Sequence, residues 1–383
     1  MKALILSCNT GEGHNSSAKA ILNELQVQGY ECEMRDTLSL VSETTSKNVS
    51  AIYVYSTKSS LFGKAYKLGE KISDINLTSS PINLANRVYT KPLLKLIQDN
   101  GFDIVVCTHL FPAEALTHLK SKGVLDVPTM FVMTDYTCIP FLPETNLDKY
   151  IIPHEHLIEE YVEKGLDRNK LYPLGIPVRE DLFAKRIPRE EARKQVEELT
   201  GWVSSDEGSR WFLIMGGSMG HGNMHTLIEE LLKDCAPQDR IICVCGRNEE
   251  QKQQLDSEFG NNYCVKSLGY TDKVSLLMDA SDVLFSKPGG ITSTEAIVKN
   301  IPLIHSEPIK GVEDQNALFF HYHGMSYRSL DPVYQSKVAM RLCDDKEYRQ
   351  RMLDAQKLNR CPDTCKRIVE LMKEMVNEKM QAE

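Results

Sequence analysis

The chain has 383 residues, of which 42% are apolar and 26% charged, and its formal net charge is −8. This length favours two domains over one, and the acidic balance argues against a nucleic-acid-binding protein. The eleven cysteines form no C-x-x-C pair, which is typical of reduced thiols in the cytoplasm. No apolar run approaches the ~20 residues of a membrane span, and the N-terminal run is too short for a signal peptide. We therefore expect a cytoplasmic protein.

Short apolar runs alternate with helical patterns in the first half of the chain. Strands are predicted at 2–7, 103–109, 129–135 and 149–154, and helices at 17–28 and 112–122. This alternation predicts βαβ units around a parallel sheet. The runs are apolar throughout, as expected of strands that are covered on both faces.

The loop after the first strand, "LSCNTGEGHNSSA" at 6–18, combines two glycines with a histidine. It lacks the third glycine of a dinucleotide-binding fingerprint. We expect Ser16 or Ser17 to cap a helix that runs through 18–25. His14 itself has three interpretations: a catalytic base, a hydrogen-bond donor to a bound anion, or a structural loop histidine.

A stretch rich in proline and glycine, residues 172–183, then interrupts the pattern and predicts a linker. A charged amphipathic helix follows at 188–199, and the alternation of strand and helix resumes near residue 210. We predict two similar α/β domains, at 1–178 and 179–355, and a helical, polar segment at the end of the chain.

Two glycine turns stand between a strand and a helix in the second half, "GGSMG" and "KPGG". A helix that starts there presents free backbone N–H groups and the positive end of its dipole to a phosphate. Glycine removes the Cβ that would block such an approach. Glycines also make ordinary tight turns, but two such turns followed by the hydroxyl residues Ser218 and Thr292 favour a diphosphate site.

Several polar residues beyond the second turn suit a sugar nucleotide. Glu295, on the first turns of its helix, is placed to bind the hydroxyls of a ribose, or simply to complement the helix dipole. A short loop then carries four adjacent hydrogen-bonding side chains, Glu313, Asp314, Gln315 and Asn316. Such a cluster fits a polyhydroxylated ligand, although similar clusters also start helices.

Residues 46–95 form a basic segment, with eight positive and two negative side chains and a net charge of +6. Basic residues interleaved with aromatic ones suit an anionic lipid surface. The alternative is a solvated helical face. We expect the membrane-binding residues to be Lys58, Phe62, Lys64, Tyr66, Lys67 and Lys71.

The motifs "GEGHNSSA", "GGSMG", "KPGGITSTEA" and "GVEDQN" together resemble those of the diacylglycerol glycosyltransferases. This family includes processive bacterial glucosyltransferases and plant monogalactosyldiacylglycerol synthases. The resemblance runs from Lys2 to about Tyr327. It implies the α/β GT-B fold, with two Rossmann-like domains facing each other across a cleft and a C-terminal helix, 356–383, that packs back on the first domain.

The resemblance also implies a reaction: inverting transfer of a hexose from UDP-glucose or UDP-galactose to diacylglycerol or a similar lipid. The expected place is the inner face of the cell membrane, where the protein would bind peripherally. Neither a metal nor another cofactor is implied, and the sequence contains no D-x-D motif.

By position, the resemblance implies that His14 is the general base. His109 and Asp135, at later strand ends of the same domain, are candidates to orient His14 or to bind the acceptor, and the alternative for each is a structural polar role. The resemblance also implies a donor site in the second domain. Its diphosphate contacts are Gly217 and Ser218, with a turn below the phosphates at Gly289, Gly290 and Ile291, and its uracil contacts are Gly269 and Tyr270. The implied ribose contact is Glu295, and the implied sugar contacts are Glu313 and Asn316, with Asp314 and Gln315 beside them.

Two positions depart from the family pattern. Val312 stands where these enzymes carry glutamine, and Asn9 stands where the plant enzymes carry aspartate. Three alternatives stay open: an N-acetylglucosaminyltransferase acting on a polyprenyl lipid, a UDP-sugar 2-epimerase, and a non-catalytic regulator that binds a nucleotide sugar. An epimerase would need a soluble substrate and no lipid-binding patch, and intact His14 and Glu295 argue against a regulator.

Overall fold

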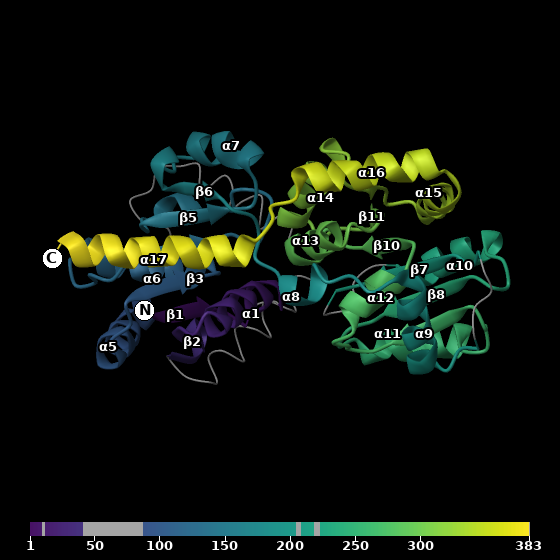
Figure 1. Cartoon of the computed structure of the whole chain (residues 1–383), viewed down its shortest axis with the longest axis horizontal. Helices are drawn as coiled ribbons and strands as arrows, with labels where there is room; N and C mark the ends of the chain where they lie inside the picture. Colours follow the sequence, from purple (N-terminus) through teal and green to yellow (C-terminus); the bar gives the residue numbers. More distant parts are fainter. Residues whose placement is uncertain (10–11, 41–86, 204–207, 218–222, 383) are drawn as a thin grey trace. The chain divides into compact units, whose positions relative to one another are not determined.

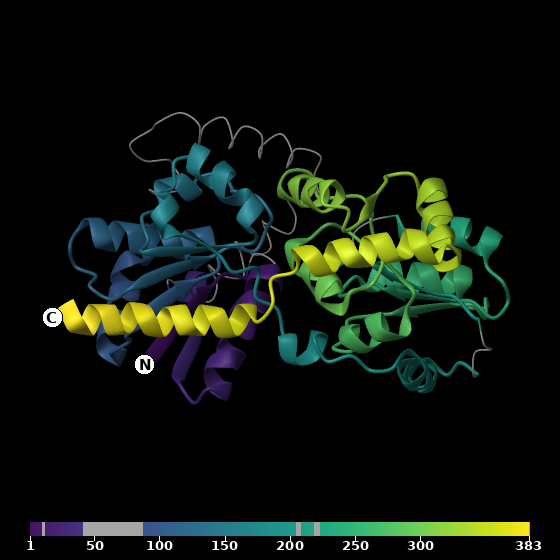
Figure 2. The ribbon, with the colours of Figure 1, turned by 45° about the horizontal axis from the view of Figure 1, so that its top comes forward.

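The computed structural model of the chain describes residues 1–9, 12–40, 87–203, 208–217 and 223–382. The chain divides into two compact units. The first unit contains 1–180, 310–312 and 361–383, and the second contains 181–309 and 313–360. Figures 1 and 2 show that each unit is a sheet covered by helices on both faces.

The first unit is built on six parallel strands in the order β2-β1-β3-β4-β5-β6. The strands are β1 (Lys2–Ser7), β2 (Glu31–Asp36), β3 (Ile104–Cys107), β4 (Thr129–Val132), β5 (Lys149–Ile152) and β6 (Leu171–Pro173). The helices of this unit are α1 (Glu12–Val27), α5 (Thr90–Asn100), α6 (Leu110–Ser121), α7 (Ile158–Glu163) and α17 (Thr364–Ala382).

The C-terminal helix α17 belongs to the core of the first unit. It lies beside α1 across one face of the sheet (Figure 1). Ile21 of α1 and Ile368 and Met372 of α17 are fully buried against Ile5 and Val106 of the strands. Burying side chains of this size is worth about 1.5–3 kcal/mol each, so α17 is integral to a unit whose other elements precede it by some 180 residues.

The second unit also has six parallel strands, in the order β12-β11-β10-β7-β8-β9. The strands are β7 (Trp211–Met215), β8 (Arg240–Val244), β9 (Val265–Leu268), β10 (Val283–Ser286), β11 (Leu303–His305) and β12 (Tyr327–Arg328). The helices are α9 (Arg189–Thr200), α10 (Met224–Asp234), α11 (Glu249–Phe259), α12 (Val274–Ala280), α13 (Gly290–Lys299), α14 (Val312–Tyr322), α15 (Pro332–Asp344) and α16 (Lys346–Asn359), and the short α8 (Glu180–Phe183) precedes them.

The strand orders place a topological switch point in each sheet. The chain order reverses between β1 and β3 in the first sheet and between β7 and β10 in the second. Open α/β sheets bind ligands outside the carboxyl ends of their strands at such a point. The loop that leads to His14 follows β1, and the two glycine turns follow β7 and β10, so these three motifs lie at switch points.

Some local predictions from the sequence are wrong. The helix predicted to begin near Ala18 begins at Glu12, because Asn15 bonds to Ser7 and Asn9 and holds the first turn over the end of β1. Ser17 is therefore not a cap. It lies inside α1 and its hydroxyl donates to the Pro177 carbonyl at 3.0 Å.

The sequence also failed to predict three strands, all at or near sheet edges. The strand β2 is largely polar and partly exposed, so it lacks the apolar run that marks a central strand. The strand β6 falls at the start of the predicted linker and ends in Pro173, which an edge strand tolerates. The strand β12 has only two residues.

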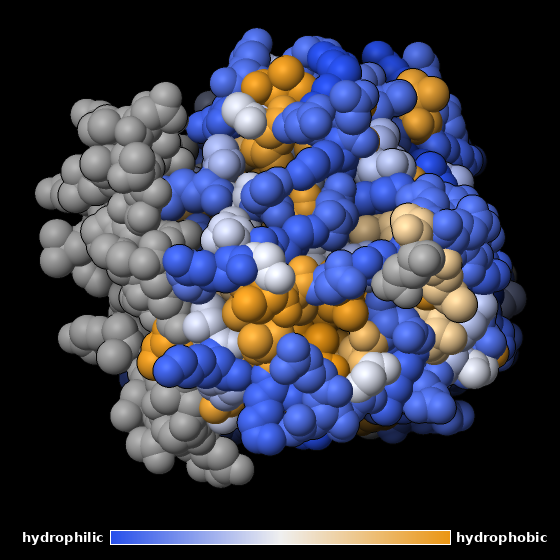
Figure 3. Space-filling model, turned by 90° about the vertical axis from the view of Figure 1, so that its left-hand side faces the viewer, coloured by the Kyte–Doolittle hydropathy of each residue, from blue (hydrophilic) through white to orange (hydrophobic). Residues whose placement is uncertain are grey.

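No helix in the part of the chain that the structure describes is both long and apolar enough to cross a membrane. Figure 3 views the side on which the C-terminal end of α17 lies, where apolar residues gather in patches bordered by hydrophilic ones. The six residues predicted to bind a membrane, between Lys58 and Lys71, lie outside the described residues.

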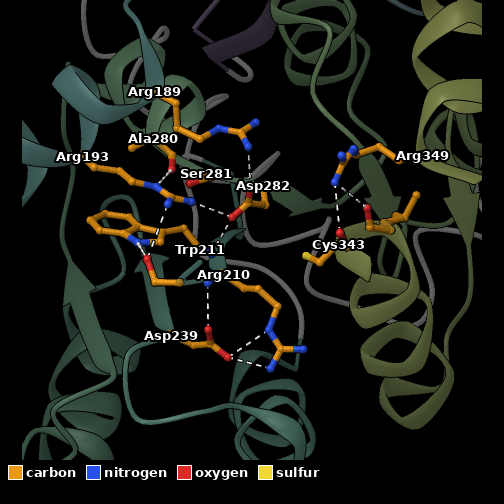
Figure 4. Close-up of polar contacts among 12 residues, drawn as sticks. Arg189, Arg193, Arg210, Trp211, Asp239, Ala280, Ser281, Asp282, Cys343 and Arg349 are labelled. Carbon is orange, nitrogen blue, oxygen red and sulfur yellow. Dashed lines mark hydrogen bonds and ion pairs between the residues drawn. The ribbon is translucent and has the colours of Figure 1, made fainter. Parts of the chain in front are cut away.

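The amino edge of the second sheet is held by ion pairs (Figure 4). Asp282, which precedes β10, accepts hydrogen bonds from Arg189 at 2.6 Å and Arg193 at 2.7 Å. The backbone N–H of Trp211 donates to the same carboxylate at 2.8 Å. These contacts tie α9 to two neighbouring strands on the edge away from the glycine turns.

Candidate active site

His14 lies in the first turn of α1 and is held by the loop that follows β3. Its Nδ1 is 2.7 Å from the carbonyl oxygen of Thr108. The Thr108 hydroxyl in turn donates to the His14 carbonyl at 3.1 Å. The two segments that flank the switch point of the first sheet are therefore linked in both directions.

The Thr108 carbonyl determines which nitrogen of His14 carries the proton. A carbonyl can only accept, so Nδ1 bears the hydrogen and Nε2 keeps its lone pair. The Thr134 hydroxyl lies 3.1 Å from the same Nδ1 and 3.4 Å from Oδ2 of Asp135. The Asp135 carboxylate thus reaches the imidazole through Thr134. Among the described residues, Nε2 has no hydrogen-bond partner.

The surroundings of His14 favour its neutral form. Burial lowers the pKa of His14 below its ordinary value of 6.5, and the Asp135 charge and the Thr108 carbonyl partly oppose that change. A neutral imidazole with a free Nε2 is the form that can accept a proton near pH 7.

His109 has a structural role, which is one of the alternatives that its place in the sequence left open. Its Nδ1 accepts a hydrogen bond from the Phe111 N–H at 3.2 Å and caps the start of α6. Its ring meets the edge of the His14 ring, with 4.6 Å between centroids. Burial, together with His14, lowers the pKa of His109 well below 6.5. His109 is therefore a neutral neighbour of His14, and its predicted part in acceptor binding stays a prediction.

In the second unit, the two glycine turns meet at the switch point. Gly217 follows β7 in the left-handed region, with φ of 69°, and Lys287 follows β10. A Cβ at Gly217 would lie only 2.7 Å from Cε of Lys287. The left-handed backbone favours glycine at this position, and the end of the Lys287 side chain lies against it. Ser218 lies outside the described residues.

The start of α13 is open to a ligand. Its N-cap residue, Gly289, has no side chain, and no described side chain caps the helix. The N–H groups of the first turn, which begins with Gly290 and Ile291, therefore lack a capping partner and carry the positive end of the helix dipole. The predicted phosphate contact at this helix start stays a prediction.

Glu295 is a half-buried carboxyl on α13 that has no hydrogen-bond or ion-pair partner within the described ranges. Burial raises its pKa from 4.5 to about 8. Unpaired carboxyl groups that burial perturbs in this way are candidates for ligand contacts.

The four residues predicted to share a loop instead lie on the first turns of α14. The helix points their side chains in different directions. Asn316 is fully buried and donates to the Pro288 carbonyl at 3.0 Å, and Asp314 lies 3.7 Å from Arg328. Gln315 is exposed. Glu313 alone of the four forms an ion pair at the glycine turns, with Lys287.

Tyr270 follows β9, and its side chain is 64% exposed. The guanidinium of Arg247 lies 5.2 Å from the centre of its ring. Gly269, which precedes it, would accommodate a Cβ at ordinary contact distances of 3.7 Å or more. Their proposed contact with uracil stays a prediction that rests on the resemblance.

No group of three or more His, Cys, Asp and Glu side chains is placed to hold a metal ion in the part of the chain that the structure describes. The charged side chains near the second switch point include Lys287, Glu295 and Glu313. Lys287 therefore supplies a positive charge beside the glycine turns.

Comparisons with known proteins agree with this arrangement. Residues 14–178 match the family model of monogalactosyldiacylglycerol (MGDG) synthase, and residues 212–368 match that of the glycosyltransferase family 28 C-terminal domain. The processive diacylglycerol beta-glucosyltransferase of Bacillus pumilus is 32% identical over 327 residues, which cover 84% of this chain and 82% of that protein. The chain belongs to the diacylglycerol glycosyltransferase family. The corresponding enzyme of Bacillus cereus is 28% identical over 96% of this chain and 92% of its own.

Solved structures confirm the fold expected of this family. MurG of Acinetobacter baumannii has a TM-score of 0.64 at 14% identity and covers 98% of this chain and 100% of its own. The UDP-GlcNAc 2-epimerase of Neisseria meningitidis has a TM-score of 0.63 at 15% identity, with the same coverage. The chain therefore has the GT-B fold, and it is a glycosyltransferase.

Three residues at the switch points were missed by the sequence analysis: Thr108, Thr134 and Lys287. Each directly follows a buried strand or comes within two residues of its end. That position was the signal that could have identified them, because side chains at the carboxyl ends of parallel strands gather at the ligand edge.

Proposed function

We propose that this glycosyltransferase transfers a hexose from a UDP-sugar to diacylglycerol with inversion at the anomeric carbon. Family membership supports the lipid acceptor, and both relatives named above are processive diacylglycerol beta-glucosyltransferases. The observation that carries the mechanism is the His14 imidazole, whose Nδ1–H binds the Thr108 carbonyl while Nε2 keeps a lone pair for a proton.

In the proposed reaction, Nε2 of His14 takes the proton of the acceptor hydroxyl as its oxygen attacks the anomeric carbon. A bond forms from that oxygen to the carbon, and the bond from the carbon to the phosphate oxygen breaks, so that UDP leaves with the electron pair. Attack from the face opposite UDP converts an α-linked donor into a β-linked product. The resulting imidazolium is stabilised by Asp135 through the Thr134 hydroxyl and then returns its proton to solvent.

The donor would bind at the second switch point. The open N-terminus of α13 and the turn at Gly217 would contact the diphosphate, and Glu295 would accept hydrogen bonds from the ribose. Fixed N–H groups and a helix dipole can stabilise a departing phosphate without a metal. We accordingly expect the affinity for UDP, measured by calorimetry, to be the same with magnesium and with EDTA. Loss of binding in EDTA would contradict this mechanism.

The acceptor is a membrane lipid, so we propose that the protein works on the inner face of the cell membrane. The support is the basic segment at 46–95 with its net charge of +6, which suits anionic lipid. The choice between UDP-glucose and UDP-galactose is left to the assay.

The deciding experiment incubates the protein with each UDP-hexose and diacylglycerol vesicles and identifies the products by mass and by the anomeric coupling constant. A β-linked hexosyl lipid is the expected product. A 2-epimer of the sugar would instead indicate an epimerase. Transfer to an added polyprenyl lipid would indicate an enzyme of the polyprenyl-lipid N-acetylglucosaminyltransferase type. UDP binding without turnover would indicate a regulator.

The same assay tests the base. His14→Ala should lower turnover about 10²–10⁴-fold, the usual contribution of general acid–base catalysis, and leave UDP affinity within twofold. His156→Ala is the matched control, because His156 is an exposed histidine of the same unit. Wild-type turnover in His14→Ala would move the base to another residue.

A further inference from the structure

We propose that Lys287 binds the diphosphate of the donor and that Glu313 is its counter-ion only while the site is empty. This inference rests on the proposed function and deepens it. It names the positive side chain that stabilises the leaving diphosphate, and it explains how donor binding frees Glu313 to contact the sugar. The resemblance implied no role for Lys287.

The position of Lys287 is the first argument. It is the first residue after β10, at the switch point of the second sheet. Its side chain crosses Gly217, and its Nζ is 3.7 Å from the place where a Cβ of Gly289 would be. The ammonium group therefore lies between the two glycine turns. The two glycines nearest to it, Gly217 and Gly289, have no side chain that would separate the ammonium from a phosphate seated there.

Lys287 and Glu313 form a largely buried ion pair beside the glycine turns. Their side chains are only 19% and 12% exposed, and Nζ of Lys287 contacts Oε1 of Glu313. The other oxygen, Oε2, accepts a hydrogen bond from the Ile309 N–H at 2.7 Å. Glu313 is thus held by its backbone partner whether or not Lys287 is present.

The attraction within such an ion pair is largely offset by the cost of removing both charges from water, so the pair adds little to the stability of the fold. Its place at the ligand edge therefore favours a binding role over a structural one. A diphosphate carries more negative charge than a carboxylate and forms strong hydrogen bonds with an ammonium. It would compete with Oε1 of Glu313 for Nζ of Lys287.

Donor binding would then rearrange the pair. Lys287 turns to the diphosphate and offsets the charge that grows there as the bond to the anomeric carbon breaks. Oε1 of Glu313 becomes free to accept hydrogen bonds from the sugar hydroxyls, while the Ile309 N–H keeps Oε2 in place. The phosphate and sugar contacts are thereby coupled through one ion pair.

The test compares uridine, UDP and UDP-glucose by calorimetry at one salt concentration. Lys287→Met should weaken UDP binding about 10- to 100-fold, the range of a hydrogen bond to a charged group, and leave uridine binding within twofold. Lys287→Arg should recover most of the UDP affinity. Lys337→Met is the matched control, because it removes one exposed lysine of α15 in the same unit and should change neither affinity.

Glu313→Gln provides a second, opposite test. It should strengthen UDP binding, because Lys287 loses its competing carboxylate, and it should reduce the affinity gained from the glucose moiety. A merely structural pair predicts otherwise: Lys287→Met and Glu313→Gln would then weaken uridine and UDP binding alike.

The outcomes separate this inference from the proposed function. If the wild type binds UDP and Lys287→Met binds it equally well, the role of Lys287 is refuted and the proposed function stands. If the wild type binds neither uridine nor UDP, the proposed donor site is wrong, and both the proposed function and the role of Lys287 are refuted. Thermal unfolding of each variant shows whether it is folded, and Lys287→Arg and Glu313→Gln preserve the size of the side chain.

Discussion

The raised pKa of Glu295 predicts that nucleoside binding depends on pH. Burial places this pKa at about 8, so only about one carboxyl in ten is ionised at pH 7. A carboxylate accepts hydrogen bonds from both ribose hydroxyls, whereas the neutral acid must present its own proton. Ribose binding should therefore select the ionised form. Uridine is the appropriate ligand, because it has no phosphate that titrates in the same range.

The magnitude follows from the ionised fraction. With a pKa of about 8, that fraction rises from about 1% at pH 6 to about 50% at pH 8. Uridine affinity should thus increase about tenfold from pH 6 to pH 7 and up to about 50-fold by pH 8. Glu295→Gln should bind uridine more weakly at pH 8 and show no such dependence.

The same shift has a consequence for stability. The folded-state pKa lies above the ordinary value of 4.5, so between these two values the folded protein binds more protons than the unfolded chain. Stability consequently falls as the pH rises through this window. Glu295→Gln should remove that cost and raise the free energy of unfolding at pH 7.5, on the order of 4 kcal/mol, with little effect at pH 4.5.

The assays are calorimetric titration with uridine from pH 6 to pH 8 and denaturant unfolding at pH 4.5 and pH 7.5. Glu229→Gln, on the partly exposed surface of α10, is a matched control. A flat uridine affinity in the wild type, or the same slope in Glu295→Gln, would refute ribose binding by an ionised Glu295.

Three further predictions concern the base, the amino edge and the membrane. Because burial lowers the pKa of His14, kcat/KM for the acceptor, measured with saturating UDP-sugar, should fall on the acid side with a midpoint below pH 6.5, and Asp135→Asn should move that midpoint lower; a midpoint above 6.5 would contradict the assignment. Asp282→Ala leaves two arginines and a buried N–H without their carboxylate, so it should cost about 3–5 kcal/mol in denaturant unfolding, and a loss below ~1 kcal/mol would show that the pairs contribute little. The protein should sediment with anionic vesicles and be released by salt. Replacing Lys58, Lys64, Lys67 and Lys71 by glutamine should weaken vesicle binding by about 1 kcal/mol for each charge near the membrane surface, without changing UDP affinity. Unchanged sedimentation would exclude this segment as the membrane contact.

The sequence by itself determined the central strands and the place of the main motifs. Apolar runs such as "VLF" and "IICV" became the centres of the buried strands β10 and β8, because strands covered on both faces need mainly apolar residues. The glycine turns after β7 and β10 were predictable because parallel strands bring their carboxyl ends to one edge. His14 was identified by its motif, which also indicated the family.

Only the tertiary structure decided what the site residues contact. Thr108 holds His14 from 94 residues away, and Glu313 pairs with Lys287 from 26 residues away. Local patterns record the period of a helix or strand and the chemistry of a turn, but not which strands become neighbours. The order of the strands brings β1 next to β3 and β7 next to β10, and that order results from packing the whole chain. The proton on Nδ1 of His14 and the burial that raises the pKa of Glu295 are therefore properties of the assembled sheets.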